Sequence, residues 1–173
     1  MDRVIKCDLS VSSIQSAIKE LQDYRDTLQD KLNDLVDALV KEGIAVAKVQ
    51  LVSGQGDSKD AVVDAFYIES SGAISKAIIA LDGKDALFIE FGSGIRYNNG
   101  NAHPYSKQFG YGVGTYPSEH PPNRAINPGY WWYGKTGEAL HLSFGTEATM
   151  PIYHAAETIR NIKIQKAIEI FKG

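Results

Sequence analysis

The sequence predicts an α+β fold in which a long N-terminal helix and a C-terminal helix pack on a small, mainly antiparallel β-sheet, with a long ordered loop. Three observations predict it: a helical apolar stripe near the N-terminus, two β-branched runs around a short turn, and a second helical periodicity near the C-terminus. The 173 residues, 43% of them hydrophobic, are enough to bury one core. We therefore expect one domain over residues 1–173.

The long helix is predicted over residues 12–42. Apolar side chains recur there at alternating steps of three and four residues, as in a coiled coil, with Arg25 as the one polar interruption. This stripe comprises Ile14, Ile18, Leu21, Leu28, Leu32, Leu35 and Leu39. Ser12 and Gln15 have capping-box spacing, and Gly43 is expected to end the helix. A helix of about 30 residues spans roughly 45 Å. Part of it therefore reaches beyond its own core or packs on another subunit, unless the whole helix is a core helix that lies along one sheet.

Residues 61–95 are expected to form an antiparallel hairpin followed by the segment EFGSG at residues 90–94. The two β-branched runs of the hairpin, residues 61–69 and 73–81, flank the turn signal Ser-Ser-Gly. A short strand is also predicted over residues 3–9.

The second half of the chain begins with a segment rich in Gly, Asn, Pro, Tyr and Ser, residues 96–128. A loop of this length is functional, ordered by a partner, or a plain insertion, and its aromatic residues favour order. Residues 129–146 are predicted to form an aromatic hairpin. A terminal helix is predicted over residues 149–171, with Thr149 as its N-cap and Pro151 in its first turn.

Composition narrows the classes of function. The formal net charge is −3, so we expect no specific nucleic-acid binding. Cys7 is the only cysteine, which excludes an intramolecular disulfide framework and suits a reducing cytosol. No window approaches the roughly 18 apolar residues of a membrane span, and the N-terminus lacks a signal-peptide pattern. We expect a protein that is made in the cytoplasm and has no membrane partner.

The stretch GYWWYGKT at residues 129–136 fits the phosphate-binding pattern G-x-x-x-x-G-K-[ST]. A true phosphate loop joins a buried strand to a helix, whereas this stretch follows PPNRAINP and precedes Gly137. Its four bulky aromatic residues would also crowd the phosphates. We therefore expect no nucleotide cofactor, with Lys135 and Thr136 in a hairpin turn and the two tryptophans on opposite faces of a strand.

No catalytic residue and no metal site can be assigned from spacing. No two of the histidines lie three to five residues apart; they are His103, His120, His141 and His154. Glu90 lies between apolar residues and has two interpretations. It could be an acid or base at the edge of a pocket, or a carboxylate that accepts backbone N–H bonds where the chain turns at Gly92 and Gly94. The second is favoured because no partner acid or base can be named.

The order of these segments resembles the neck and tail-completion family of long-tailed (siphovirus) phages, whose members are also described as minor capsid proteins. The family segment A-x-x-x-E-F-G-T/S-G corresponds to residues 86–94, and its G-x-W-W/Y stretch to residues 129–133. The family's H-x-T-x-G-x-x-A/S stretch is matched by His141, Ser143, Gly145 and Ala148. The chain departs from the family in having Ser143 where Thr is usual and in placing Pro151 about one position late.

The resemblance implies a structural virion protein and not an enzyme. It implies a homo-oligomer, commonly a hexameric ring, at the head–tail junction, which completes the tail or joins it to the head beside neighbouring phage neck and tail proteins. Such rings need heterologous contacts, for which the acidic face of the long helix and the long loop are candidates. The residues expected to matter for structure or interaction are Glu90, Phe91, Gly92, Gly94, Trp131, Trp132, Tyr133, His141, Gly145 and Pro151.

Two alternatives remain open at this point. A small cell-wall hydrolase could use Glu90 with Glu138 or His141 and bind sugar on its aromatic residues. A carbohydrate-binding module could use the aromatic stretch alone.

Overall fold

The computed structural model describes residues 4–54, 60–71, 74–94, 103–110, 131–133, 137 and 139–172. The elements in chain order are α1 (Val11–Gly54), β1 (Val62–Ser71), β2 (Ile74–Asp82), α2 (Ala86–Phe91), α3 (Ser106–Phe109), β3 (Trp131–Tyr133), β4 (His141–Ser143) and α4 (Pro151–Lys172). The strands form two antiparallel hairpins, β1–β2 and β3–β4. The predicted α+β class, with a long first helix and a C-terminal helix, is confirmed.

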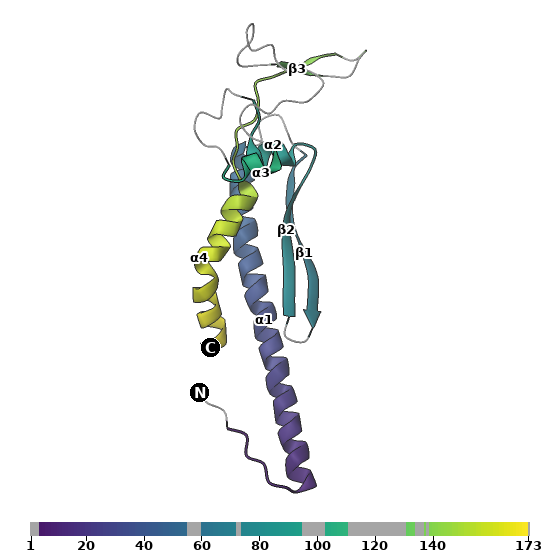
Figure 1. Cartoon of the computed structure of the whole chain (residues 1–173), viewed down its shortest axis with the longest axis vertical. Coiled ribbons are helices and arrows are strands. Elements are labelled where there is room, and N and C mark those ends of the chain that lie inside the picture. Colours follow the sequence, from purple (N-terminus) through teal and green to yellow (C-terminus); the bar gives the residue numbers. More distant parts are fainter. Residues whose placement is uncertain are drawn as a thin grey trace.

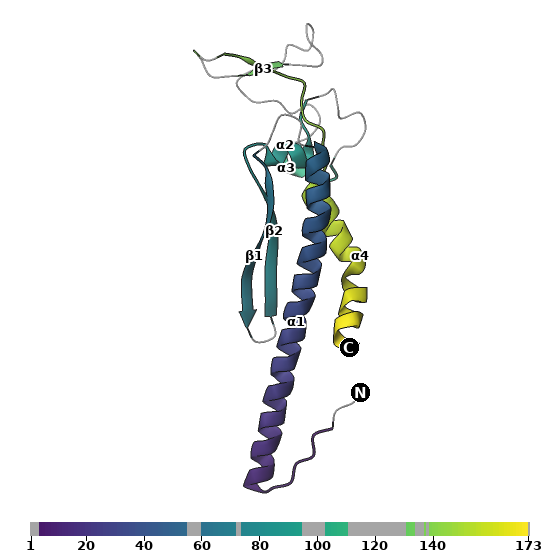
Figure 2. The same cartoon turned by 180° about the vertical axis from the view of Figure 1, so that it is seen from behind.

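The molecule is elongated along α1, which lies between α4 on one side and the β1–β2 hairpin on the other (Figures 1 and 2). The two helices run antiparallel, because Gly43 faces Ile159 and Lys31 reaches the carbonyl oxygen of Phe171 near the end of α4. The short helices α2 and α3 lie at the end where α1 finishes, and the β3–β4 hairpin lies beyond them (Figure 1). None of the described helices is long and apolar enough to cross a membrane.

The predicted end of the first helix at Gly43 was wrong, because α1 continues to Gly54. Gly43 is buried, and a Cβ there would lie 2.5 Å from Cδ1 of Ile79 in β2 and 2.8 Å from Cδ1 of Ile159 in α4. The glycine therefore lets two layers approach α1 at one point, which offsets its helix-propensity cost of about 1 kcal/mol. The last turns then bury Ala47 and Leu51 in the core.

The β1–β2 hairpin is confirmed and packs one face on α1. On that inner face Ala61 and Val63 belong to the core cluster, with Ile79 and Leu81 packed against it. The remaining members of the cluster are Ala47, Leu51, Ile89 and Ala155. Because side chains alternate along a strand, the residues between them point to the opposite, outer face, where Phe66 and Ile78 are cross-strand partners.

The start of α1 also differs from the prediction. Residues 4–9 form no strand, and the helix begins one residue before Ser12. Its cap is Ser10, whose hydroxyl accepts a hydrogen bond from the Ser13 N–H at 3.3 Å and whose carbonyl accepts one from the Ile14 N–H at 3.0 Å. The expected capping box of Ser12 and Gln15 was therefore wrong: the cap lies two residues earlier, and the N–H of Ser10 donates to Asp8 and not to a side chain in the first turn.

The first half of α1 projects beyond its own core. Among the described residues, the tip of the hairpin meets α1 at Gln29, whose side-chain amide donates to the carbonyl of Ile74 at 3.4 Å. The end of α4 meets it at Lys31. Residues 11–28, which we name the arm, extend past both (Figures 1 and 2). Both alternatives for the long helix therefore hold, each for one half of it.

The other elements of the C-terminal half largely follow the sequence. The aromatic hairpin is confirmed, with Trp132 opposite Leu142. The predicted terminal helix is confirmed as α4, which runs without interruption from Pro151 to Lys172. Of the long loop, residues 103–110 are described, and they include α3.

Candidate functional site

Two glycines end α2 and turn the chain toward α4. Gly92 and Gly94 have φ angles of 78° and 68°, a region that glycine adopts without strain. Between them Ser93 pairs with Thr146, through Ser93 N–H to Thr146 O at 2.9 Å and Thr146 N–H to Ser93 O at 3.2 Å. A Cβ on Gly145 would collide with the carbonyl oxygen of Ser93. These glycines therefore allow the segment after α2 to lie directly against the segment before α4.

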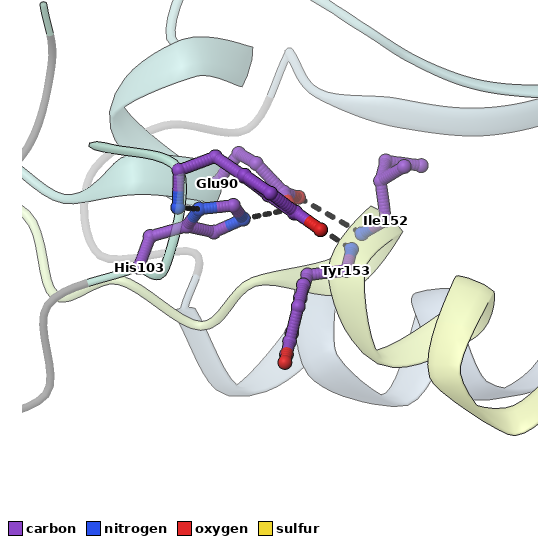
Figure 3. A network of polar contacts seen from close by, with 5 residues as sticks. Glu90, His103, Ile152 and Tyr153 are labelled. Carbon is purple, nitrogen blue, oxygen red and sulfur yellow. Dashed lines mark hydrogen bonds and ion pairs between the residues drawn. The ribbon is translucent and has the colours of Figure 1, made fainter. Parts of the chain in front are cut away.

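Glu90 lies in the last turn of α2, is buried, and points at the first turn of α4 (Figure 3). Its Oε2 accepts a hydrogen bond from the backbone N–H of Ile152 at 2.8 Å. Its Oε1 accepts one from the N–H of Tyr153 at 2.9 Å and lies 3.1 Å from Nε2 of His103. Both carboxylate oxygens are thus engaged by groups of the protein itself.

These bonds make Glu90 the cap of α4. The first N–H groups of any helix lack intrahelical partners, and the helix dipole places partial positive charge there. Pro151 occupies the first position, where the missing N–H costs nothing, and the next two N–H groups point at the carboxylate. The negatively charged carboxylate of Glu90, which is distant in the sequence, therefore accepts hydrogen bonds from the free N–H groups at the start of α4.

The expectation that Thr149 caps this helix was wrong. Its side-chain hydroxyl is buried and has no hydrogen-bond partner among the described residues. The first intrahelical bond runs from the His154 N–H to the carbonyl of Met150 at 2.9 Å, so Met150 is the cap residue. Met150 has a φ of 52°, and its side chain has no oxygen to accept an N–H bond. Glu90 supplies that acceptor in its place.

His103 completes the cluster from the long loop. It is 4% exposed, and its Nδ1 accepts a hydrogen bond from the Tyr105 N–H at 3.1 Å. Because Nδ1 acts as an acceptor, the ring proton is on Nε2 and is donated to Glu90, which describes a neutral imidazole. The ring lies edge-on to Phe91 and to Tyr153, with centroids 4.4 and 5.2 Å away. His103 therefore fastens the described part of the loop to α2 and α4.

The pairing of a carboxylate with an imidazole is also found in acid–base catalysts. In this pair, however, the polar atoms are already hydrogen-bonded within the protein. Each oxygen of Glu90 and each ring nitrogen of His103 has a partner in the protein. The favoured interpretation of Glu90 is confirmed in kind, because it accepts backbone N–H bonds. The donors, however, lie 62 and 63 residues away in the sequence and not at its own turn. What the arrangement does is hold α2, the loop and α4 together.

We name Glu90, His103 and the first turn of α4, with Ile152 and Tyr153, the capping cluster. Most of the expected motif residues belong to it or lie beside it. Phe91 packs on His103 and also on Phe109, at a centroid distance of 5.5 Å. Gly92, Gly94, Gly145 and Pro151 shape the chain around it, as described above. His103 was not singled out by the sequence, because nothing in its local spacing relates it to Glu90.

The remaining motif residues lie in the β3–β4 hairpin, apart from the capping cluster (Figure 1). Trp132 is 49% exposed, and His141 is exposed on β4. Trp131 and Tyr133 lie on β3, but their side chains, and so the expected opposite orientation of the two indoles, fall outside what the structure describes. The same holds for Lys135, Thr136 and Glu138.

Among the described residues, no three His, Cys, Asp or Glu side chains gather where they could hold a metal ion. Comparisons of the chain with protein-family models, with curated proteins and with solved structures found no match.

Proposed function

We propose that this chain is a structural subunit that works by assembling with copies of itself and with neighbouring proteins. The observation that carries the proposal is the amount of apolar surface that the described fold leaves uncovered. Much of that surface lies on two regular elements, the arm and the outer face of the β1–β2 hairpin, where several exposed apolar side chains are neighbours. A soluble monomer rarely leaves contiguous apolar patches of this kind exposed, and such patches usually mark interaction sites.

The arm carries the first residues of the predicted heptad stripe. Ile14, Ile18 and Leu21 are 41, 51 and 56% exposed, and Val11 and Tyr24 are exposed beside them. In the second half of α1 the same helix is covered by α4 and the hairpin (Figures 1 and 2). A heptad stripe is the pattern by which helices pack on one another, so its bare half is suited to a partner.

The capping cluster supports the structural interpretation. It engages its own buried polar groups fully, with hydrogen bonds that join segments more than sixty residues apart. Catalytic acids and bases need a face open to a substrate, whereas a satisfied network rigidifies the fold. We therefore infer that Glu90 is not a catalytic residue but maintains the shape that the assembly requires, in a structural protein and not an enzyme.

The resemblance to phage neck and tail-completion proteins supports a location for this assembly in the virion. We propose that the chain forms a ring, of six copies as is common among the proteins it resembles, at the head–tail junction of a long-tailed phage virion. There it completes the tail or joins it to the head, after assembly in the host cytoplasm. An elongated subunit with exposed apolar surface at several places suits a ring that contacts proteins on both sides.

The test is to delete this gene from a phage whose genome carries it. We expect heads and tails that accumulate without joining, and restoration of joining when the purified chain is added to the lysate. Electron microscopy of the purified chain, alone and with its neck partners, should show rings. Normal joining without the gene, together with a chain that never associates, would refute the proposal.

A further inference from the structure

We propose that the arm of one copy docks along the outer face of the β1–β2 hairpin of a neighbouring copy. The outer face is defined by Val62, Phe66, Ile74 and Ile78, which are exposed side chains on the side of the hairpin away from α1. The inference deepens the proposed function and rests on it for the closure of the contacts into a ring. The contact itself concerns two copies of this chain and can be tested on the purified protein.

No described helix or strand covers the outer side of the hairpin (Figures 1 and 2). Its inner face packs on the second half of α1, while on its outer face Phe66 and Ile78 are 56 and 50% exposed although they are directly opposed across the strands. Small sheets are stable in proteins when their apolar faces are covered by another layer. An apolar helix of the kind that covers the inner face would complete the outer one.

The arm has the dimensions of that missing layer. Its 18 residues span roughly 27 Å at about 1.5 Å per residue. The nine residues of β2 span roughly 30 Å at about 3.3 Å per residue. Each surface presents four or five half-exposed apolar side chains, at roughly 100 Å² each on the scale of a buried aromatic ring. Together they would remove roughly 900 Å² of apolar surface from water, near the lower limit of approximately 1,000 Å² for a specific interface.

The charges of the two surfaces are compatible. Within the stripe the arm carries a single charge, Arg25, whereas the outer face holds charges of both signs on Asp64, Lys76 and Asp82. The residues that flank the stripe of the arm are uncharged; they are Gln15, Ala17, Gln22 and Tyr24. The edges of the arm therefore bring no charge against the face, and Arg25 can lie beside Asp64 or Asp82 and away from Lys76. A parallel pairing of two arms would instead bring Arg25 against its own copy.

A heterologous contact also accounts for both surfaces at once. A single two-fold contact between identical surfaces would cover either the arms or the outer faces and would leave the other kind bare. A contact between unlike surfaces covers both in every copy and propagates from subunit to subunit, closing into a ring when the rotation allows it. This is the type of contact that the proposed ring requires.

The test uses two variants that each lack one surface. The arm variant combines Ile18→Glu with Leu21→Glu. The face variant combines Phe66→Lys with Ile78→Glu, which places opposite charges on a directly opposed pair and so preserves the hairpin. The control is Val49→Glu, which likewise replaces an exposed apolar side chain by glutamate, at a 69% exposed position on the solvent side of α1. Light scattering measures the mass of each protein, and far-UV circular dichroism verifies its fold.

We expect the control to assemble like the wild type and each variant alone to be a monomer. An equimolar mixture of the two variants should form one-to-one dimers and nothing larger, because only one intact arm can meet one intact face. If either variant alone assembles like the wild type, or if the mixture stays monomeric while the wild type assembles, the contact is wrong. A wild-type chain that is monomeric at every concentration also overturns it.

A second measurement covers the case of a variant that fails to fold. In a Cys7→Ser background, a chain with Leu21→Cys and a chain with Ile78→Cys are mixed and oxidised. We expect the mixed disulfide to exceed both homodimers severalfold; equal or smaller amounts would contradict the docking. Failure of these experiments with normal wild-type rings leaves the proposed function standing, whereas the phage test above decides that function separately.

Discussion

Replacing Glu90 by Gln should lower the free energy of unfolding by about 3 kcal/mol, because glutamine offers one acceptor oxygen where glutamate offers two. The oxygen of the amide can keep the two bonds of Oε1, from Tyr153 and His103. The NH₂ group then faces the Ile152 N–H across 2.8 Å, donor against donor. An unsatisfied buried donor costs about 1–3 kcal/mol, and loss of the negative charge at a helix N-terminus costs about 0.3–2 kcal/mol more.

The measurement is urea denaturation followed by circular dichroism, made in the arm-variant background so that association does not add to stability. The matched control is Glu157→Gln, the same substitution in α4 at a half-exposed glutamate paired with Arg160. Exposed pairs of this kind contribute up to about 1 kcal/mol. A loss below about 1 kcal/mol for Glu90→Gln, or one equal to that of the control, would refute the assignment of Glu90 as the cap of α4.

Three further predictions concern stability. Gly145→Ala should lower the free energy of unfolding, measured by urea denaturation, by about 1–3 kcal/mol more than Gly137→Ala does. Both glycines have a φ of 94°, but only a Cβ on Gly145 would meet backbone atoms of a neighbouring described segment. Equal losses would contradict the close approach. Gly43→Leu should lower the free energy of unfolding by at least about 1–3 kcal/mol by forcing α1 from β2 and α4, whereas Gly43→Ala meets only methyl ends and should stay within about 1 kcal/mol of the wild type. Desolvation and a hydrogen bond with Asp37 raise the pKa of Tyr67 above its ordinary 10.0, so the stability it contributes is present below pH 10 and is lost as the pH rises through its folded pKa. Denaturation at successive pH values above 10 should therefore show a steeper loss for the wild type than for Tyr67→Phe, and parallel curves would exclude the effect.

The sequence predicted those elements whose signals are local. The heptad stripe of α1 and the turn signal between β1 and β2 each lie within a few residues of the structure they determine. The aromatic hairpin and the C-terminal helix were predicted for the same reason. Periodicity and turn chemistry act over short separations, so they are readable in one chain.

Two of the errors, at Gly43 and Thr149, arise where a distant contact overrides a local signal. Gly43 carries the local signature of a helix end, but it is retained inside the helix because β2 and α4 both press on it. Thr149 has the side chain of an N-cap, but the acceptor for α4 comes from Glu90. The partnership of Glu90 with His103 has no periodic signal at all, because the two residues meet only after the loop folds back.

The contrast between local signals and distant contacts also explains why the arm is helical although no described element packs on its apolar stripe. An isolated helix of 18 residues is marginal in water, because its first turn must be nucleated at a large entropic cost. In this chain the nucleus exists already, since the second half of α1 is held between α4 and the hairpin, and the capping cluster fixes where α4 begins. The arm extends that helix by propagation alone, which costs much less per residue. A preformed arm loses little conformational entropy on docking, so modest apolar contact with a neighbour can become net affinity.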